Sequence, residues 1–139
     1  LIVKRRNALQ LTLKILAILL TLGFLALGLS ALLSPESALA GPAFAWSPDG
    51  VAGLSAGRGV LGGHFLSLGM VAVYALVKSE YKLLYVLALS ELMIVVGRLL
   101  SLGIDGFDQR MLMPLVIEVI MAAGMFCAAK FLQPSASTQ

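Results

Sequence analysis

The segment ILAILLTLGFLALGLSALL, residues 15–33, contains nineteen residues and no charged side chain. A helix needs about 20 apolar residues to cross a bilayer core of about 30 Å. Three further stretches of similar length and character follow at residues 55–77, 83–102 and 111–132, although each of them contains ionisable residues. The sequence therefore predicts an all-α integral membrane protein, in which residues 1–139 form a single domain, a four-transmembrane-helix antiparallel bundle.

The composition excludes a water-soluble globule. Of the 139 residues, 60% are hydrophobic and another 14 are Gly, against 10 Lys or Arg and 7 Asp or Glu. Soluble domains contain about 45–50% apolar residues, Gly included, so we expect the lipid bilayer to be the main solvent. The single cysteine, Cys127, excludes an internal disulfide and a multi-cysteine metal centre. The net charge of +3 does not indicate nucleic-acid binding, because the cations flank apolar runs.

The positions of lysine and arginine beside the spans predict the orientation in the membrane. Seven cations fall on one predicted side, namely Lys4, Arg5, Arg6, Lys14, Lys78, Lys82 and Lys130. The opposite side carries Glu36, Asp49, Asp105 and Asp108, with Arg110 as its clearly extramembrane cation. We therefore expect both termini in the cytoplasm and a multi-pass protein of a bacterial inner membrane.

The N-terminal segment also has the parts of a secretory signal. A basic start and an apolar run precede Ala38-Leu39-Ala40, which has the pattern of a cleavage site. The apolar run of nineteen residues, however, exceeds the about 7–15 residues that are usual in a signal peptide. We expect an uncleaved first span.

The predicted outer loop, residues 34–54, is the longest connection. Ser34, Pro35 and Glu36 are typical of a helix start, with a capping residue, a proline at the first position and an acid near the positive end. We expect a short interfacial helix here, then Phe44 and Trp46 at the headgroup level and a turn at residues 47–50. Shorter polar turns are predicted at residues 78–82 and 103–110.

Small residues recur at a spacing of four in the second span. They are Ser55, Gly59, Gly63 and Ser67, and the third span has Gly97 and Ser101 at the same spacing. Because lipid tails are as apolar as leucine, helices in a membrane associate through close backbone approach at such residues. Two interpretations stay open: the small residues pack the chain's own bundle, or they contact a partner helix or a flat cofactor.

Five ionisable residues lie inside predicted spans: Arg58, His64, Glu91, Arg98 and Glu118. A charge exposed to lipid at a helix centre costs about 2.5–3.5 kcal/mol on insertion scales, so these side chains are expected to face one another or a wet cavity. A rise of about 1.5 Å per residue places the two arginines nearer the outer surface than the glutamates. We expect Arg98 to pair with Glu118, and Arg58 with Glu91 or Glu118.

This polar cluster has a structural and a functional interpretation. As a buried clasp, it would fix the register of the second, third and fourth spans. Alternatively, Glu91, near the bilayer midplane, is a carboxylate that binds a proton or another cation.

His64 is the single histidine of the chain and follows Gly62 and Gly63. The two glycines leave room for a macrocycle, so His64 could be the axial ligand of a haem or a chlorophyll-type pigment. A b-type haem would need a second ligand, for which the chain offers Met70, Met121 or Met125. A hydrogen-bonded interior histidine is the simpler interpretation, and no other cofactor or metal is expected.

The sequence contains no recognisable catalytic set. Serines and threonines lack a paired base, and no His, Cys and carboxylate group has metal-ligand spacing. The Gly-rich residues 56–63 neither follow a strand nor include a Walker lysine. We therefore expect that the protein is not an enzyme.

Two blocks carry a resemblance to a known family. RGVLGGHF, residues 58–65, and GRLLS, residues 97–101, followed by Asp105-Gly106 and by Glu118 in the last span, resemble a family of small four-span bacterial membrane proteins described as a domain of unknown function. The resemblance covers about residues 22–132. It implies the four-span fold and the importance of Arg58, Gly62, Gly63, Arg98 and Glu118, and it brings no activity. The family often has an acidic residue two positions before its first arginine, where this chain has Ala56.

These observations predict a non-enzymatic accessory or structural subunit of a larger membrane complex. A respiratory or photosynthetic complex is conceivable, although no residue identifies one. Its expected partners are the lipid bilayer and other membrane protein subunits or a second copy. An alternative is a small proton-coupled transporter or channel that uses an intramembrane carboxylate, although arginines beside the carboxylates would hold such a site ionised. A third is a pigment or haem binder through His64.

Overall fold

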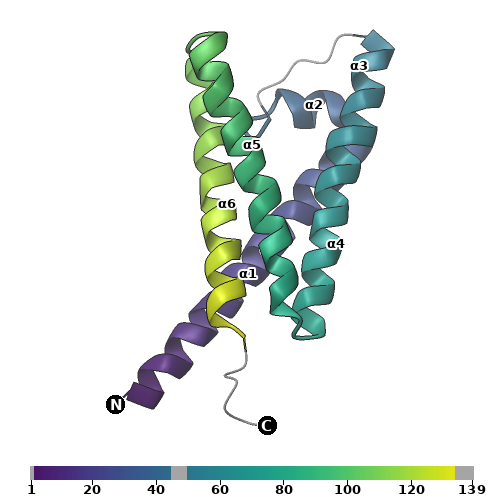
Figure 1. Ribbon diagram of the computed structural model, residues 1–139. Helices are drawn as coiled ribbons and strands as arrows, with labels where there is room; N and C mark the ends of the chain where they lie inside the picture. The colour runs from purple at the N-terminus through teal and green to yellow at the C-terminus, as the bar shows by residue number, and fades with distance from the viewer. Residues whose placement is uncertain (1, 45–49, 134–139) are drawn as a thin grey trace.

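The computed structural model describes residues 2–44 and 50–133, with side chains from Asn7 onward (Figure 1). In these residues it contains helices and no strand. The elements are α1 (Ile2–Leu33), α2 (Pro35–Ala40), α3 (Gly50–Ala56), the π-helical η1 (Gly57–Gly62), α4 (Gly63–Val77), the 3₁₀-helical η2 (Tyr81–Leu83), α5 (Leu84–Ile104), the 3₁₀-helical η3 (Gln109–Met111) and α6 (Leu112–Phe131).

Four helical segments are long and apolar enough to cross a membrane. They are Asn7–Leu33, Gly50–Val77, Tyr81–Ile104 and Gln109–Phe131. The prediction of an all-helical chain with four helices long and apolar enough to span a membrane is confirmed. Most helices extend a few residues beyond the predicted apolar limits, because charged residues such as Lys14 end the apolar run without ending the helix.

The four long helices associate mainly as two pairs. α1 packs along η1 and α4, α5 packs along α6, and α1 also contacts α6. By contrast, α4 and α5 diverge from the turn that joins them and have few contacts (Figure 1). Phe24 of α1 stacks on Phe65 of α4 with ring centroids 6.1 Å apart. The core therefore lies along α1, between the α4 side and the α5–α6 side.

Glycine allows α1 to approach the second span closely, for example at Gly28 and Gly62. A Cβ atom on Gly28 would collide with the backbone of Leu66, and one on Gly62 would lie 2.9 Å from Leu32 Cγ. Real Cβ atoms essentially never come so near to another atom. The two contacts are reciprocal, since one glycine belongs to each helix. Close packing through small residues, which the sequence predicts, thus occurs at these glycines.

The expected stripe of small residues does not make these contacts. A Cβ atom on Gly59, Gly63 or Gly97 would meet nothing within 4 Å in the described part of the chain. Ser55 and Ser67 are exposed. Of the two interpretations, contact within the chain's own bundle is therefore not observed for Gly59, Gly63 and Gly97 among the described residues.

The reason is the π-helical segment, which holds one more residue per turn than a straight α-helix. Residues five apart then lie above one another, so Gly57 and Gly62 are both buried while Gly59 between them is exposed. The remaining predicted small residue, Ser101, donates a hydrogen bond to Asp105 Oδ2 at 2.6 Å. A spacing of four in the sequence therefore does not identify the packed face.

The short helix α2 confirms the helix predicted after Ser34, with Pro35 at its first position. Ser34 does not cap it through its side chain. Phe44 is buried and meets the Phe65 ring edge-on, with ring centroids 5.3 Å apart, and its place at the headgroup level stays a prediction. The connection folds back over the core, which covers this apolar ring. Trp46 and residues 47–49 of the expected turn lie outside the described residues.

Both short turns are present where the sequence predicts them. Ser79 in the first has a φ of 58°, and Gly106 in the second has a φ of 97°. In the second turn Asp108 caps η3, because its Oδ1 accepts a hydrogen bond of 2.8 Å from Arg110 N. The Arg110 side chain also donates to Asp108 Oδ2 at 2.6 Å, and these bonds lower the pKa of Asp108.

Candidate intramembrane polar site

Arg98 of α5 and Glu118 of α6 form an ion pair. Arg98 Nε donates to Glu118 Oε1 at 2.8 Å and to Oε2 at 2.7 Å. Glu118 is buried and Arg98 is partly buried. Charge-assisted hydrogen bonds offset the cost of taking both groups out of water. The Arg98–Glu118 pair that the sequence predicts is present, and it joins α5 to α6.

Glu91 of α5 is the opposite case. Its side chain is fully buried at 0% exposure, and neither carboxyl oxygen has a hydrogen-bond partner in the described part of the chain. It lies two helical turns before Arg98, hence on the same face of α5. Arg98 is engaged by Glu118 instead. Burying an unpaired carboxylate is far more costly than burying a neutral carboxylic acid. The arrangement therefore suits a carboxyl group that carries its proton.

His64 links α4 to α5. Its Nε2 lies 3.3 Å from the Oγ of Ser90, the residue directly before Glu91. The ring of Phe65 meets the His64 ring edge-on, with ring centroids 5.3 Å apart. This is the geometry of a hydrogen-bonded interior histidine. Axial ligation of a metallated macrocycle through Nε2 would displace Ser90.

Arg58 lies apart from the other ionisable residues. Its Nε donates to the Leu32 carbonyl oxygen at 3.2 Å, near the C-terminal end of α1. The expected pairing of Arg58 with Glu91 or Glu118 is therefore wrong. The last carbonyl groups of a helix lack intrahelical partners and carry partial negative charge, so they attract a cation. Arg58 also lines a pocket of about 490 Å³ together with Glu36.

The five predicted residues thus lie in three places. Arg98 and Glu118 pair between α5 and α6, and Arg58 lies at the end of α1. His64 contacts Ser90, the residue next to Glu91. The sequence reasoning missed Ser90. A signal was available, because Ser90 is a polar residue inside an apolar span and next to Glu91. No three His, Cys, Asp or Glu residues among those described could hold a metal ion together.

Comparison with known proteins identifies the family. Residues 12–129 match the family described as domain of unknown function DUF4345. The chain belongs to the DUF4345 family. The match includes both sequence blocks, RGVLGGHF and GRLLS, and it confirms the resemblance that these blocks indicate. No curated protein and no solved structure matches the chain.

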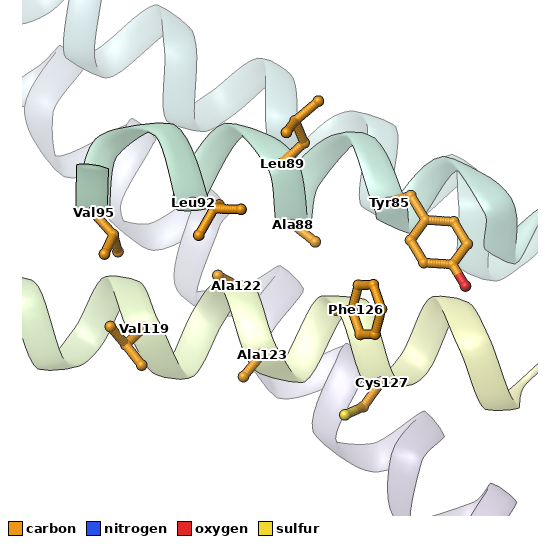
Figure 2. Close-up of a pocket in the computed structure, with 10 residues that line it drawn as sticks. All are labelled: Tyr85, Ala88, Leu89, Leu92, Val95, Val119, Ala122, Ala123, Phe126 and Cys127. Atoms are coloured by element: carbon orange, nitrogen blue, oxygen red, sulfur yellow. The ribbon is translucent and has the colours of Figure 1, made fainter. Parts of the chain in front are cut away.

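This DUF4345 chain also has an apolar groove of about 590 Å³ between α5 and α6. Figure 2 shows Val95 and Val119 at one end of the groove, and Tyr85 and Phe126 at the other. The two aromatic rings meet edge-on with centroids 5.4 Å apart. Sequence reasoning missed this groove, since it arises from the pairing of two helices.

Proposed function

We propose that this DUF4345 protein is a non-enzymatic subunit that packs into a larger membrane complex through α4 and α5. The observation that carries the proposal is the open space around Gly59, Gly63 and Gly97. These residues have the small size that membrane helices use for close approach, and the chain's own helices leave them without a close neighbour. A transmembrane helix of another subunit would supply that neighbour.

On α5, the small residues share the face that is turned toward α4. Ser90 faces α4 through its contact with His64. Gly97 and Ser101 follow Ser90 by seven and eleven residues, so they share its face of α5. α4 and α5 diverge beyond this contact (Figure 1). A partner helix beside this face of α5 would meet Gly97.

We also propose an antiparallel bundle with both termini in the cytoplasm, in a bacterial inner membrane. The support is the distribution of lysine and arginine between the connections. Lys78 and Lys82 lie at the α4–α5 turn, whereas Arg110 on the opposite side is engaged by Asp108. Cysteine labelling from either side of the membrane, at Ser79 and at Gln109, would test this orientation.

The subunit proposal is tested by gentle solubilisation from the native membrane, sizing, and identification of what co-migrates. Gly97→Leu fills the open space on α5, and Gly23→Leu is the matched control, because Gly23 on α1 also has nothing within 4 Å of an added Cβ. We expect a stoichiometric partner with the wild type and with Gly23→Leu, and its loss with Gly97→Leu. A wild type that runs as a free chain or a simple homodimer contradicts the proposal.

A second candidate function is proton transport, which the burial of Glu91 favours. The sequence disfavours a carrier, because arginines beside the intramembrane carboxylates would keep these carboxylates ionised. That objection does not apply to Glu91. Arg98 is hydrogen-bonded to Glu118, and Arg58 is hydrogen-bonded to the Leu32 carbonyl oxygen. Because no cation holds Glu91 in its ionised form, its carboxyl group can take up and release a proton when water reaches it.

Liposomes that contain the purified protein and an entrapped pH-sensitive dye test this second candidate. The wild type is expected to dissipate an imposed pH gradient faster than protein-free liposomes. Glu91→Gln should remove that difference, while Glu36→Gln, an exposed position at the outer end, should keep it. Equal rates for the wild type and protein-free liposomes would remove the candidate.

A further inference from the structure

The groove between α5 and α6 has the shape of a channel for one hydrocarbon chain. Its lining includes the small residues Ala88, Ala122 and Ala123, which leave a depression between the larger side chains (Figure 2). From Tyr85 to Val95 the groove follows ten residues of α5, a length of about 15 Å at the usual helical rise. One leaflet of a bilayer core about 30 Å thick has the same depth.

Two lysines lie just beyond the aromatic end of the groove. Lys82 precedes Tyr85 by three residues, and Lys130 follows Phe126 by four. These spacings place each lysine on the same face of its helix as the aromatic residue. Both lysines are exposed, and neither forms an ion pair with another described residue. Lys130 Nζ lies 5.5 Å from the centroid of the Phe131 ring.

The charge of this end of the molecule favours an anion. Lys78, Lys82 and Lys130 lie here, against the single acid Glu80 in the α4–α5 turn. Tyr85 adds a phenol group at the same level, and tyrosine is enriched where a membrane meets water. Basic clusters at the ends of transmembrane helices attract anionic lipid headgroups.

We propose that the α5–α6 groove binds one acyl chain of an anionic phospholipid, whose headgroup phosphate lies between Lys82 and Lys130. The acyl chain covers the alanines and ends near Val95 and Val119. The two lysines supply the preference for an anionic over a zwitterionic headgroup. This site is separate from the small-residue region between α4 and α5, so the two proposals can fail independently.

Native mass spectrometry of the detergent-solubilised full chain tests the site. The probes are phosphatidylglycerol and phosphatidylcholine with identical acyl chains. The wild type is expected to retain phosphatidylglycerol preferentially, by about fivefold for each contributing lysine. The variant Lys82→Ser/Lys130→Ser should lose this preference and still retain both lipids weakly. Equal retention of the two lipids by the wild type overturns the headgroup assignment.

The groove itself is tested by a matched pair of variants. Ala123→Phe fills the groove at an exposed alanine, and Ala26→Phe makes the same change at an exposed alanine of α1. We expect Ala123→Phe to lose the bound phospholipid and Ala26→Phe to keep it, with equal thermal unfolding midpoints. Retention of phosphatidylglycerol by Ala123→Phe overturns the proposal. So does a change in the size of the assembly without a change in lipid retention, because the groove would then hold a protein helix.

Discussion

Arg98 Nε lies 2.7 Å from Glu118 Oε2, and this ion pair joins α5 to α6 inside a predicted membrane span. Two turns earlier on α5, the carboxyl group of Glu91 is buried without any partner among the described residues. The same apolar interior thus holds two carboxyl groups in different environments. One is neutralised by a guanidinium group, and the other is expected to be neutral because it keeps its proton.

The ion pair gives the first prediction. Glu118→Leu leaves the Arg98 charge without a counter-ion, and the cost is at most the about 2.5–3.5 kcal/mol that insertion scales give for an arginine at a helix centre. The double variant Arg98→Met/Glu118→Leu removes both charges and is expected to be much less destabilised. Unfolding in detergent, followed by circular dichroism, measures both. Equal destabilisation of the single and double variants would contradict the pairing.

The helix contact at Gly28 gives the second prediction. Gly28→Ala places a methyl group against the backbone of Leu66, and we expect a loss of about 1–3 kcal/mol of stability from overpacking. Gly23→Ala on the same helix has open space, so it is expected to be neutral or slightly stabilising. The free energy of unfolding should therefore be clearly lower for Gly28→Ala than for Gly23→Ala. If they are equal, α1 does not approach the second span as described.

The contact between His64 and Ser90 gives the third prediction. Ser90→Ala removes an interhelical hydrogen bond, and such bonds in membrane proteins average about 0.6 kcal/mol. Ser67→Ala is the control, because Ser67 Oγ donates to the backbone oxygen of His64 within its own helix. We expect a small loss of stability for Ser90→Ala and none for Ser67→Ala. A larger effect at Ser67 would count against the link between α4 and α5.

The outer turn gives a prediction about pH. The hydrogen bonds from Arg110 lower the pKa of Asp108, so the folded turn favours the ionised carboxylate. Its contribution is complete above the ordinary pKa of about 3.9 and is lost as the pH falls through the lower value in the folded protein. The amide chemical shift of Arg110 should therefore titrate below about pH 3.9. Asp108→Asn should abolish that titration, and a midpoint above the ordinary value would contradict the cap.

Much of the fold is predictable because hydrophobic length is a property of the sequence alone. Four apolar runs require four spanning helices whatever their neighbours are. The π-helical segment at Gly57–Gly62 is different, because an extra residue in a turn depends on how α1 packs against it. From the spacing of four alone, Gly59 and Gly63 are expected on the packed face. In the structure, Gly57 and Gly62 are the buried residues.

The sequence likewise predicts only one part of the polar site. Opposite charges at similar depth in neighbouring spans find each other, so the Arg98–Glu118 pair follows from the sequence. Arg58 competes for a different acceptor, the Leu32 carbonyl oxygen, which becomes visible only once the end of α1 is placed beside η1. Glu91 is left without a partner for that reason, and no pattern in the sequence indicates this.

The protonation state of Glu91 tests the central claim most directly. Infrared spectroscopy at neutral pH of the protein in a detergent without carbonyl groups detects the carbonyl band of a protonated carboxylic acid. We expect this band in the wild type and in Glu36→Gln, and its loss in Glu91→Gln. A wild type without the band, or a band that persists in Glu91→Gln, would contradict the division between one charged and one neutral buried carboxyl group.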